Sequence, residues 1–131
     1  MVCLDSDFLV AFLRGYPEAG KKMAELVKLG THLTTTPVNS YELYHGAHAS
    51  LRRRENLDKV RALLEELYII PLDDPSCDEA GRIRAALESQ GTRIGDADSL
   101  IAGTALKHGE TIVTRNVKHF SKVEGLLVER W

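Results

Sequence analysis

The feature of this sequence that most constrains its fold is a regular alternation of short apolar runs with longer stretches of helical periodicity. The short runs are aliphatic or β-branched, as in buried strands, whereas apolar residues in the longer stretches recur every three or four positions. The predicted strands are residues 2–4, 32–35, 68–70, 111–114 and 126–128, and the predicted helices are residues 8–13, 18–29, 37–51, 57–67, 74–90 and 95–108. Such alternation, with short connections, favours an α/β fold: a three-layer α/β/α sandwich with a central, mostly parallel sheet.

Length and charge limit what else the chain can be. With 131 residues, it fits one domain that buries roughly 65–70% of its unfolded surface. No repeat, linker or low-complexity segment indicates a second domain, so we expect residues 1–131 to form a single unit. The formal net charge of −2 predicts no general affinity for polyanions. Contact with nucleic acid would therefore need a local basic patch.

The ends and the cysteines of the chain indicate its compartment. Cys3 and Cys77 lack the spacing of metal ligands, and we interpret both as buried thiols in a reducing compartment. Met1 leads directly into an apolar strand, with no basic leader and no apolar run near the ~20 residues of a membrane span. The sequence therefore predicts a soluble, cytoplasmic protein without a membrane partner.

Three acidic residues are predicted to lie at the functional end of the sheet. In parallel α/β sheets this end is the crevice at the carboxyl ends of the strands. Asp5 directly follows the first strand, Glu42 lies in the helix after the second, and Asp98 lies in the first turn of the helix before the fourth. Each acid alone could instead be a helix cap or a solvent-facing residue. Their common location favours a shared site.

Helical phase distinguishes Asp98 from its neighbour Asp96. Asp98 shares one helix face with Ile101 and Ala105, at i+3 and i+7, so it is expected to continue the buried stripe into the crevice. Asp96 points elsewhere and, directly after Gly95, is interpreted as an N-cap. We therefore predict that Asp98 is the functional acid and that Asp96 is at most a supporting residue.

Glu42 is predicted to face inward as well, because it shares a helix stripe with Val38, His45, Gly46 and Ala49, which is too small and apolar for a fully solvated face. Three carboxylates about 5 Å apart would repel by roughly 3 kcal/mol per pair at an effective dielectric constant near 20. Either some of them bind protons or a divalent cation lies among them, and hard oxygen ligands select Mg²⁺ or Mn²⁺. Such an ion suits phosphodiester hydrolysis.

Four motifs together resemble the PIN-domain family, and within it the VapC-type toxins of prokaryotic toxin–antitoxin systems. The resemblance spans nearly the full chain. The matching segments are residues 4–9, with Asp5; residues 40–43, with Glu42; residues 98–105, with Asp98; and residues 112–120, with Asn116. Each motif alone is weak, but four in this order and spacing are fairly specific.

The resemblance implies a PIN-like nuclease domain whose activity is that of a Mg²⁺- or Mn²⁺-dependent endoribonuclease. It also implies a homodimer and a small VapB-type antitoxin that inserts a segment near the active site. Asp5, Glu42 and Asp98 would be the catalytic and metal-binding acids. Many relatives carry a fourth acid where this chain has Asn116, whose amide can still orient a water or a ligand.

Hydroxyl and basic residues complete the predicted site. Ser6 and Thr114, beside the acids in the motifs, are assigned supporting roles by the same resemblance. Four basic residues in or near the predicted crevice loops are candidates for contact with RNA phosphates: Arg14, Arg93, Arg115 and Lys118. The denser run at residues 52–54 could also bind RNA or an acidic antitoxin, although a solvated helix end whose cations complement the dipole is the simpler interpretation.

Two other functions fit parts of the sequence. Residues 5–7 after a strand resemble the nucleophile motif of haloacid-dehalogenase-like phosphatases, but such an enzyme would leave Glu42 without a role. A catalytically inactive PIN scaffold that only binds is the other alternative. Glu42 and His45 have the i, i+3 spacing of carboxylate-bridged di-iron bundles, but no second such pair is present.

Overall fold

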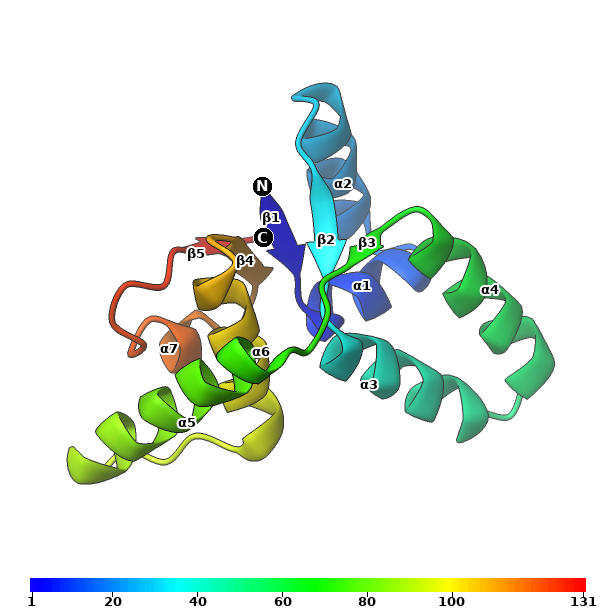
Figure 1. The fold of residues 1–131 in the computed structure, drawn as a ribbon. Coiled ribbons are helices and arrows are strands. Elements are labelled where there is room, and N and C mark those ends of the chain that lie inside the picture. The colour runs from blue at the N-terminus through cyan, green and yellow to red at the C-terminus, as the bar shows by residue number, and fades with distance from the viewer.

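A five-stranded parallel sheet forms the centre of the protein in a computed structural model that describes residues 1–131 (Figure 1). Its strands are β1 (Val2–Leu4), β2 (Leu33–Thr35), β3 (Tyr68–Ile69), β4 (Thr111–Thr114) and β5 (Val128–Arg130). Their order is β3-β2-β1-β4-β5, and every neighbouring pair is parallel. The carboxyl ends of β1, β2 and β4 therefore meet at one edge, as the sequence predicts.

Helices cover both faces of this sheet, which confirms the predicted three-layer α/β/α architecture. They are α1 (Ser6–Leu13), α2 (Pro17–Lys28), α3 (Pro37–His48), α4 (Arg53–Glu65), α5 (Asp74–Ser89), α6 (Asp96–Lys107) and α7 (Val117–Phe120). Figure 1 shows α1 to α4 on one side of the strands and α5 to α7 on the other. None of them combines the length and the apolar character needed to cross a bilayer.

The apolar core is divided between the two faces by the alternation of side chains along each strand. Leu4 and Val113 point into a cluster that includes residues from α1 to α4, whereas Cys3 and Ile112 point into a second cluster built mainly on α5, α6 and α7. All four side chains are fully buried. The middle of β1 and β4 is therefore rigidly packed, and the loops that follow these strands start from fixed positions.

Helices α5 and α6 approach each other closely at Gly103. A Cβ atom at this position would lie 2.6 Å from the backbone N and 2.7 Å from the Cα of Ala80. Only glycine lets the two helices pack at this distance. Because Asp98 lies one and a half turns before Gly103 on α6, this contact helps to set its height above the sheet.

Several details differ from the sequence-based predictions. Strand β5 begins at Val128 instead of residue 126, because its register is set by pairing with β4. The short helix α7 was not predicted. Cys3 is buried as expected, but Cys77 is exposed on α5, where Ser76, Ala80 and other neighbours form the inward face instead. Both thiols are free.

The basic run at residues 52–54 was also misinterpreted. Helix α3 ends at His48, and Arg52 is the N-cap of α4, which begins at Arg53. The three cations therefore lie at the start of a helix, where they oppose the dipole. The exposed contacts of Arg52 with Glu55 and of Arg53 with the carbonyl of His48 partly offset this unfavourable placement.

Candidate active site

Asp5 is the centre of the polar cluster at the carboxyl edge of the sheet. It follows β1 and is the N-cap of α1, where its Oδ1 accepts from the backbone N–H of Ser6 at 2.9 Å. The same oxygen accepts from Asn39 Nδ2 at 3.0 Å, and Oδ2 accepts from the hydroxyl of Thr114 at 2.7 Å. Donors from α1, α3 and β4 thus fix a carboxylate that is only 7% exposed.

The electrostatic environment of Asp5 disfavours its negative charge. The pKa of its carboxyl is raised from 3.8 to about 6, mainly by burial and further by the neighbouring carboxylates of Asp7 and Asp98, against the hydrogen bonds from Thr114 and Ser6. No lysine or arginine forms an ion pair with Asp5. A bound cation would stabilise a buried carboxylate that is held by neutral donors and lies near other acids.

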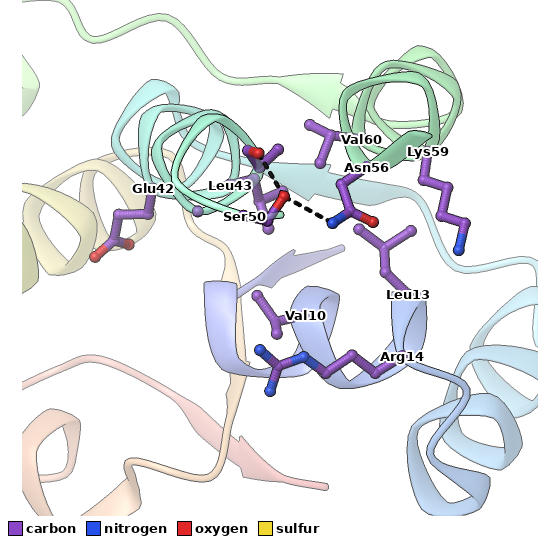
Figure 2. A pocket seen from close by; sticks show the side chains of 11 residues that line it. Val10, Leu13, Arg14, Glu42, Leu43, Ser50, Asn56, Lys59 and Val60 are labelled. Atoms are coloured by element: carbon purple, nitrogen blue, oxygen red, sulfur yellow. Dashed lines mark hydrogen bonds between the residues drawn. The ribbon is translucent and has the colours of Figure 1, made fainter. Parts of the chain in front are cut away.

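Glu42 joins this cluster through Ser6. The Ser6 hydroxyl donates to Glu42 Oε1 at 2.6 Å and accepts from Asn39 Nδ2 at 2.8 Å. Figure 2 shows Glu42 on the side of α3 that faces away from α4. The stripe that predicted its orientation is not buried: His45, Gly46 and Ala49 are exposed, and the buried face of α3 is formed by Asn39, Leu43 and Ala47. The structure therefore brings Asp5, Ser6 and Glu42 together.

Asp98 and Asp96 separate as the helical phase predicts, although Gly95, not Asp96, is the N-cap of α6. Asp96 is the first helical residue, with a side chain that is 80% exposed and paired with Arg84 on α5. Its side chain does not contact the cluster around Asp5. Asp98 is half-buried, and its negative charge contributes to the raised pKa of Asp5. The two carboxylates are therefore close enough to interact electrostatically.

Asn116 and the loop after β4 complete the cluster on the Asp98 side. Asn116 donates from its backbone N–H to Thr114 Oγ1 at 2.9 Å, and its side-chain Nδ2 lies 3.2 Å from His119 Nδ1. The same His119 nitrogen lies 3.6 Å from Asp98 Oδ2. Asn116 therefore reaches Asp98 through His119 and reaches Asp5 through Thr114.

The donor set fits a hard divalent cation in its chemistry. Asp5, Glu42 and Asp98 offer carboxylate oxygens, no cysteine lies among them, and Asp5 is buried without a balancing cation. This is the ligand type that Mg²⁺ and Mn²⁺ prefer. The three acids do not, however, form a ready-made ligand cluster, since no group of three acidic, histidine or cysteine side chains is arranged to hold a metal ion.

The four predicted RNA-contacting residues lie in different surroundings. Arg14 and Arg115 line a cavity that also includes Ser6 and Asp7, next to the acids. Arg93 is exposed in the loop between α5 and α6, and Lys118 is exposed on α7. The structure thus brings two of the four to the rim of the acidic cluster.

Three residues of the site were not identified from the sequence alone. Asn39 is fully buried and bonds both Asp5 and Ser6; its place three residues after the N-cap Thr36 was the available signal. Asp7 accepts from the backbone N–H of Arg115 at 2.9 Å. His119, on the unpredicted helix α7, joins Asn116 to Asp98 as described above.

Comparison with known proteins identifies the family. Residues 2–126 match the sequence profile of the PIN domain. The chain belongs to the PIN-domain family. It is 30% identical over 129 residues to the tRNA(fMet)-specific endonuclease VapC of Salmonella typhimurium, which covers 98% of this chain and 96% of the relative. It is also 29% identical to ribonuclease VapC2 of Rickettsia felis, over 98% of this chain and 96% of that one.

Solved structures give the same assignment. The fold matches VapBC2 from Rickettsia felis bound to a promoter DNA fragment, with a TM-score of 0.91 and 28% identity over 100% of this chain and 99% of that chain. DNA-bound VapBC from Salmonella typhimurium matches with a TM-score of 0.89 and 28% identity over the same shares. The prediction of a VapC-type PIN-domain ribonuclease is therefore confirmed, and the phosphatase alternative was wrong.

Proposed function

We propose that this PIN-domain protein is a Mg²⁺- or Mn²⁺-dependent endoribonuclease whose catalytic acids are Asp5, Glu42 and Asp98. The observation that carries the proposal is the environment of Asp5. It is a buried carboxylate with a pKa raised to about 6, held by Ser6, Asn39 and Thr114 and lacking any cationic partner. Keeping such an acid in place without neutralising it is costly for folding, and perturbed acids of this kind gather at functional sites.

The residues of the cluster would divide the work of phosphodiester hydrolysis. Asp5, Asp98 and Glu42 would hold the metal ion. When bound, it supplies Lewis-acid stabilisation of charge on the phosphoryl oxygens and lowers the pKa of water. Ser6 and Asn39 orient Asp5 and Glu42, so these carboxylates lose little freedom on binding.

Thr114 and Asn116 would act on the opposite side of the cluster. Thr114 orients Asp5 from β4, and Asn116 faces His119 beside Asp98. The Asn116 amide can donate to a phosphate oxygen or accept from a water molecule. Asp96 has no part in this scheme, because it is exposed and paired with Arg84.

The substrate we propose is RNA, with tRNA the first class to test, since the Salmonella typhimurium relative is named a tRNA(fMet)-specific endonuclease. The low aromatic content, 6%, disfavours a broad base-stacking surface. Arg14 and Arg115 at the rim of the acids are the residues we assign to phosphate contact. Arg93 and Lys118 would act only as more distant contacts.

A VapB-type antitoxin is the proposed protein partner, and a groove beside α1 offers it a place to dock. The groove has a volume of about 330 Å³ and lies between α1, α3 and α4. Figure 2 shows Val10, Leu13 and Leu43 on its apolar walls and Glu42 at one end. A helix laid in this groove would reach the active-site acid Glu42, which explains how a bound partner could inhibit cleavage. We also propose that the protein forms a homodimer, and sedimentation equilibrium tests this proposal.

The first test is cleavage of labelled tRNA and of a long single-stranded RNA by the purified protein, free of antitoxin. We expect cleavage with Mg²⁺ or Mn²⁺, none with EDTA, and none by Asp98→Asn. Asp96→Asn is the matched control because it removes a charge two residues away, outside the cluster. If folded wild-type protein leaves both RNAs intact in the presence of metal, the inactive-scaffold alternative is correct.

A further inference from the structure

A second cavity lies beside the acids, and the proposed function leaves its aromatic wall without a role. Its volume is about 460 Å³, within the ~300–1,000 Å³ of typical small-ligand pockets. Ser6 and Asp7 form the part of its wall that adjoins the active site. Arg14, Tyr16, Arg115 and Trp131 form the more distant part. An extended ligand bound at the acids would enter this cavity where it passes Ser6.

The aromatic wall of this cavity is held in place by several contacts. The indole Nε1 of Trp131 donates to Asp7 Oδ1 at 3.1 Å, and its ring meets Phe8 edge-on, with centroids 5.4 Å apart. The guanidinium carbon of Arg115 lies 3.7 Å from the Trp131 ring centroid, and Arg115 Nε donates to the main-chain oxygen of Trp131 at 3.3 Å. Arg115 and Trp131 thus form one stacked, preorganised surface.

The cavity wall carries a net positive charge, because two arginines, Arg14 and Arg115, face one acid, Asp7. Neither Arg14 nor Arg115 forms an ion pair with an aspartate or glutamate, unlike Arg82 and Arg84. Arg115 donates only from Nε, so both terminal amino groups of its guanidinium are free to bind an anion. Figure 2 shows Arg14 extending back along α1 toward Val10, a residue that also lines the cavity.

We propose that this cavity binds the nucleotide next to the scissile phosphate of the RNA. Arg14 and Arg115 bind the adjoining phosphate, and the base stacks against the surface formed by Tyr16 and the Arg115–Trp131 pair. A nucleotide supplies both the anion and the planar ring that these side chains recognise. The proposal rests on the proposed ribonuclease function and adds to it a built subsite on one side of the cut.

Trp131 provides a direct measure of occupancy, because it is the only tryptophan in the chain. The assay uses the Asp98→Asn protein in EDTA, so that no RNA is cleaved, and titrates it with a single-stranded hexaribonucleotide. We expect saturable quenching of the Trp131 fluorescence as a base stacks beside it. A nucleoside should need a concentration at least about tenfold higher for half-maximal quenching, since it lacks the phosphate.

Variants then assign the phosphate contacts through fluorescence anisotropy of labelled RNA. Arg14→Met and Arg115→Met should each weaken binding about tenfold and reduce the slope of log Kd against log salt by about 0.7, the value for one phosphate contact in a single strand. Arg61→Met is the matched control: Arg61 is an exposed arginine on α4 near Asp58 and lies outside the cavity.

The outcomes separate the subsite from the enzymatic function. RNA that binds by anisotropy without changing the Trp131 fluorescence would overturn the subsite, as would Arg14→Met and Arg115→Met proteins that keep the wild-type affinity and salt slope. Neither result would affect the ribonuclease proposal, which is tested by metal-dependent cleavage with the wild-type protein. Conversely, quenching that depends on Arg14 and Arg115 would support the subsite even if cleavage failed.

Discussion

The indole Nε1 of Trp131 donates a hydrogen bond to Asp7 Oδ1 at 3.1 Å, joining residues that lie 124 positions apart in the chain. The other oxygen of Asp7 accepts from the backbone N–H of Arg115 at 2.9 Å and lies 3.2 Å from the hydroxyl of Thr114. Asp7 therefore ties the first turn of α1 to the loop after β4 and to the residue that follows β5. This link fixes the position of the segment that carries Asp5 relative to the loop that carries Asn116.

Trp131→Phe tests the strength of this link. Phenylalanine keeps a ring against Phe8 but removes the only donor to Asp7 Oδ1, so we expect the free energy of unfolding to fall by about 1–2 kcal/mol. Urea unfolding followed by circular dichroism measures the change. Tyr41→Phe, at an aromatic residue that is 68% exposed, is the control. Equal midpoints for Trp131→Phe and wild type would contradict a structural role for the hydrogen bond.

Asp5→Asn should stabilise the metal-free protein at neutral pH. The folded-state pKa of Asp5 is raised from 3.8 to about 6, so its contribution to stability is fully present below pH 4 and is lost as the pH rises through 6. The loss amounts to about 3 kcal/mol, at 1.36 kcal/mol for each pKa unit. Unfolding of the metal-free wild-type and Asp5→Asn proteins at pH 4 and pH 7.5 measures it. A variant that is no more stable than wild type at pH 7.5 would show that the charge of Asp5 does not destabilise the folded protein.

The acids should differ sharply in their effect on activity. Asp5→Asn, Glu42→Gln and Asp98→Asn should each lower the rate of RNA cleavage by more than about 100-fold, the order expected when a preorganised charge is removed from a reacting centre. Asp96→Asn should lower it by less than about threefold, because Asp96 pairs with Arg84 outside the cluster. Initial rates at saturating Mg²⁺ give the comparison. Equal losses at Asp96 and Asp98 would refute the helical-phase assignment.

Asn39→Ala should weaken both stability and activity. The buried amide of Asn39 donates to Asp5 and Ser6, and its Oδ1 accepts from the hydroxyl of Thr36. Alanine leaves these partners without their hydrogen bonds, which costs about 1–3 kcal/mol. Cleavage should fall about tenfold or more because Asp5 and Glu42 lose their common support. Chemical denaturation and single-turnover cleavage test the two effects, and an active, fully stable variant would remove Asn39 from the site.

Gly103→Ala should destabilise the protein through packing alone. The added methyl group would lie 2.6 Å from the backbone N of Ala80, so α5 and α6 must move apart, and overpacking of this kind costs typically ~1–3 kcal/mol. Gly81→Ala is the control, because a Cβ atom there meets nothing within 4 Å. Thermal unfolding of both variants separates this steric effect from the ordinary gain in helix propensity. A stabilised Gly103→Ala protein would disprove the close contact.

Local pattern determined much of this protein. Strand and helix order, the parallel sheet with two covered faces, and the choice of Asp98 over Asp96 follow from periodicity, because a residue's helical phase depends only on its near neighbours. The N-cap Thr36 with Pro37 at the first helical position is equally local, because both preferences depend only on adjacent residues. The PIN resemblance came from short motifs that lie where such local rules place strand ends.

Tertiary structure alone decided the contacts between distant segments. The hydrogen bonds of Asn39 to Asp5, of Thr114 to Asp5 and of Trp131 to Asp7 join residues that are 34, 109 and 124 positions apart. The start of β5 and the cavity lined by Arg14 and Arg115 likewise depend on contacts between segments that are distant in the chain. An apolar pattern shows which face of an element is buried but not which partner covers it. That choice is made by the packing of the whole chain.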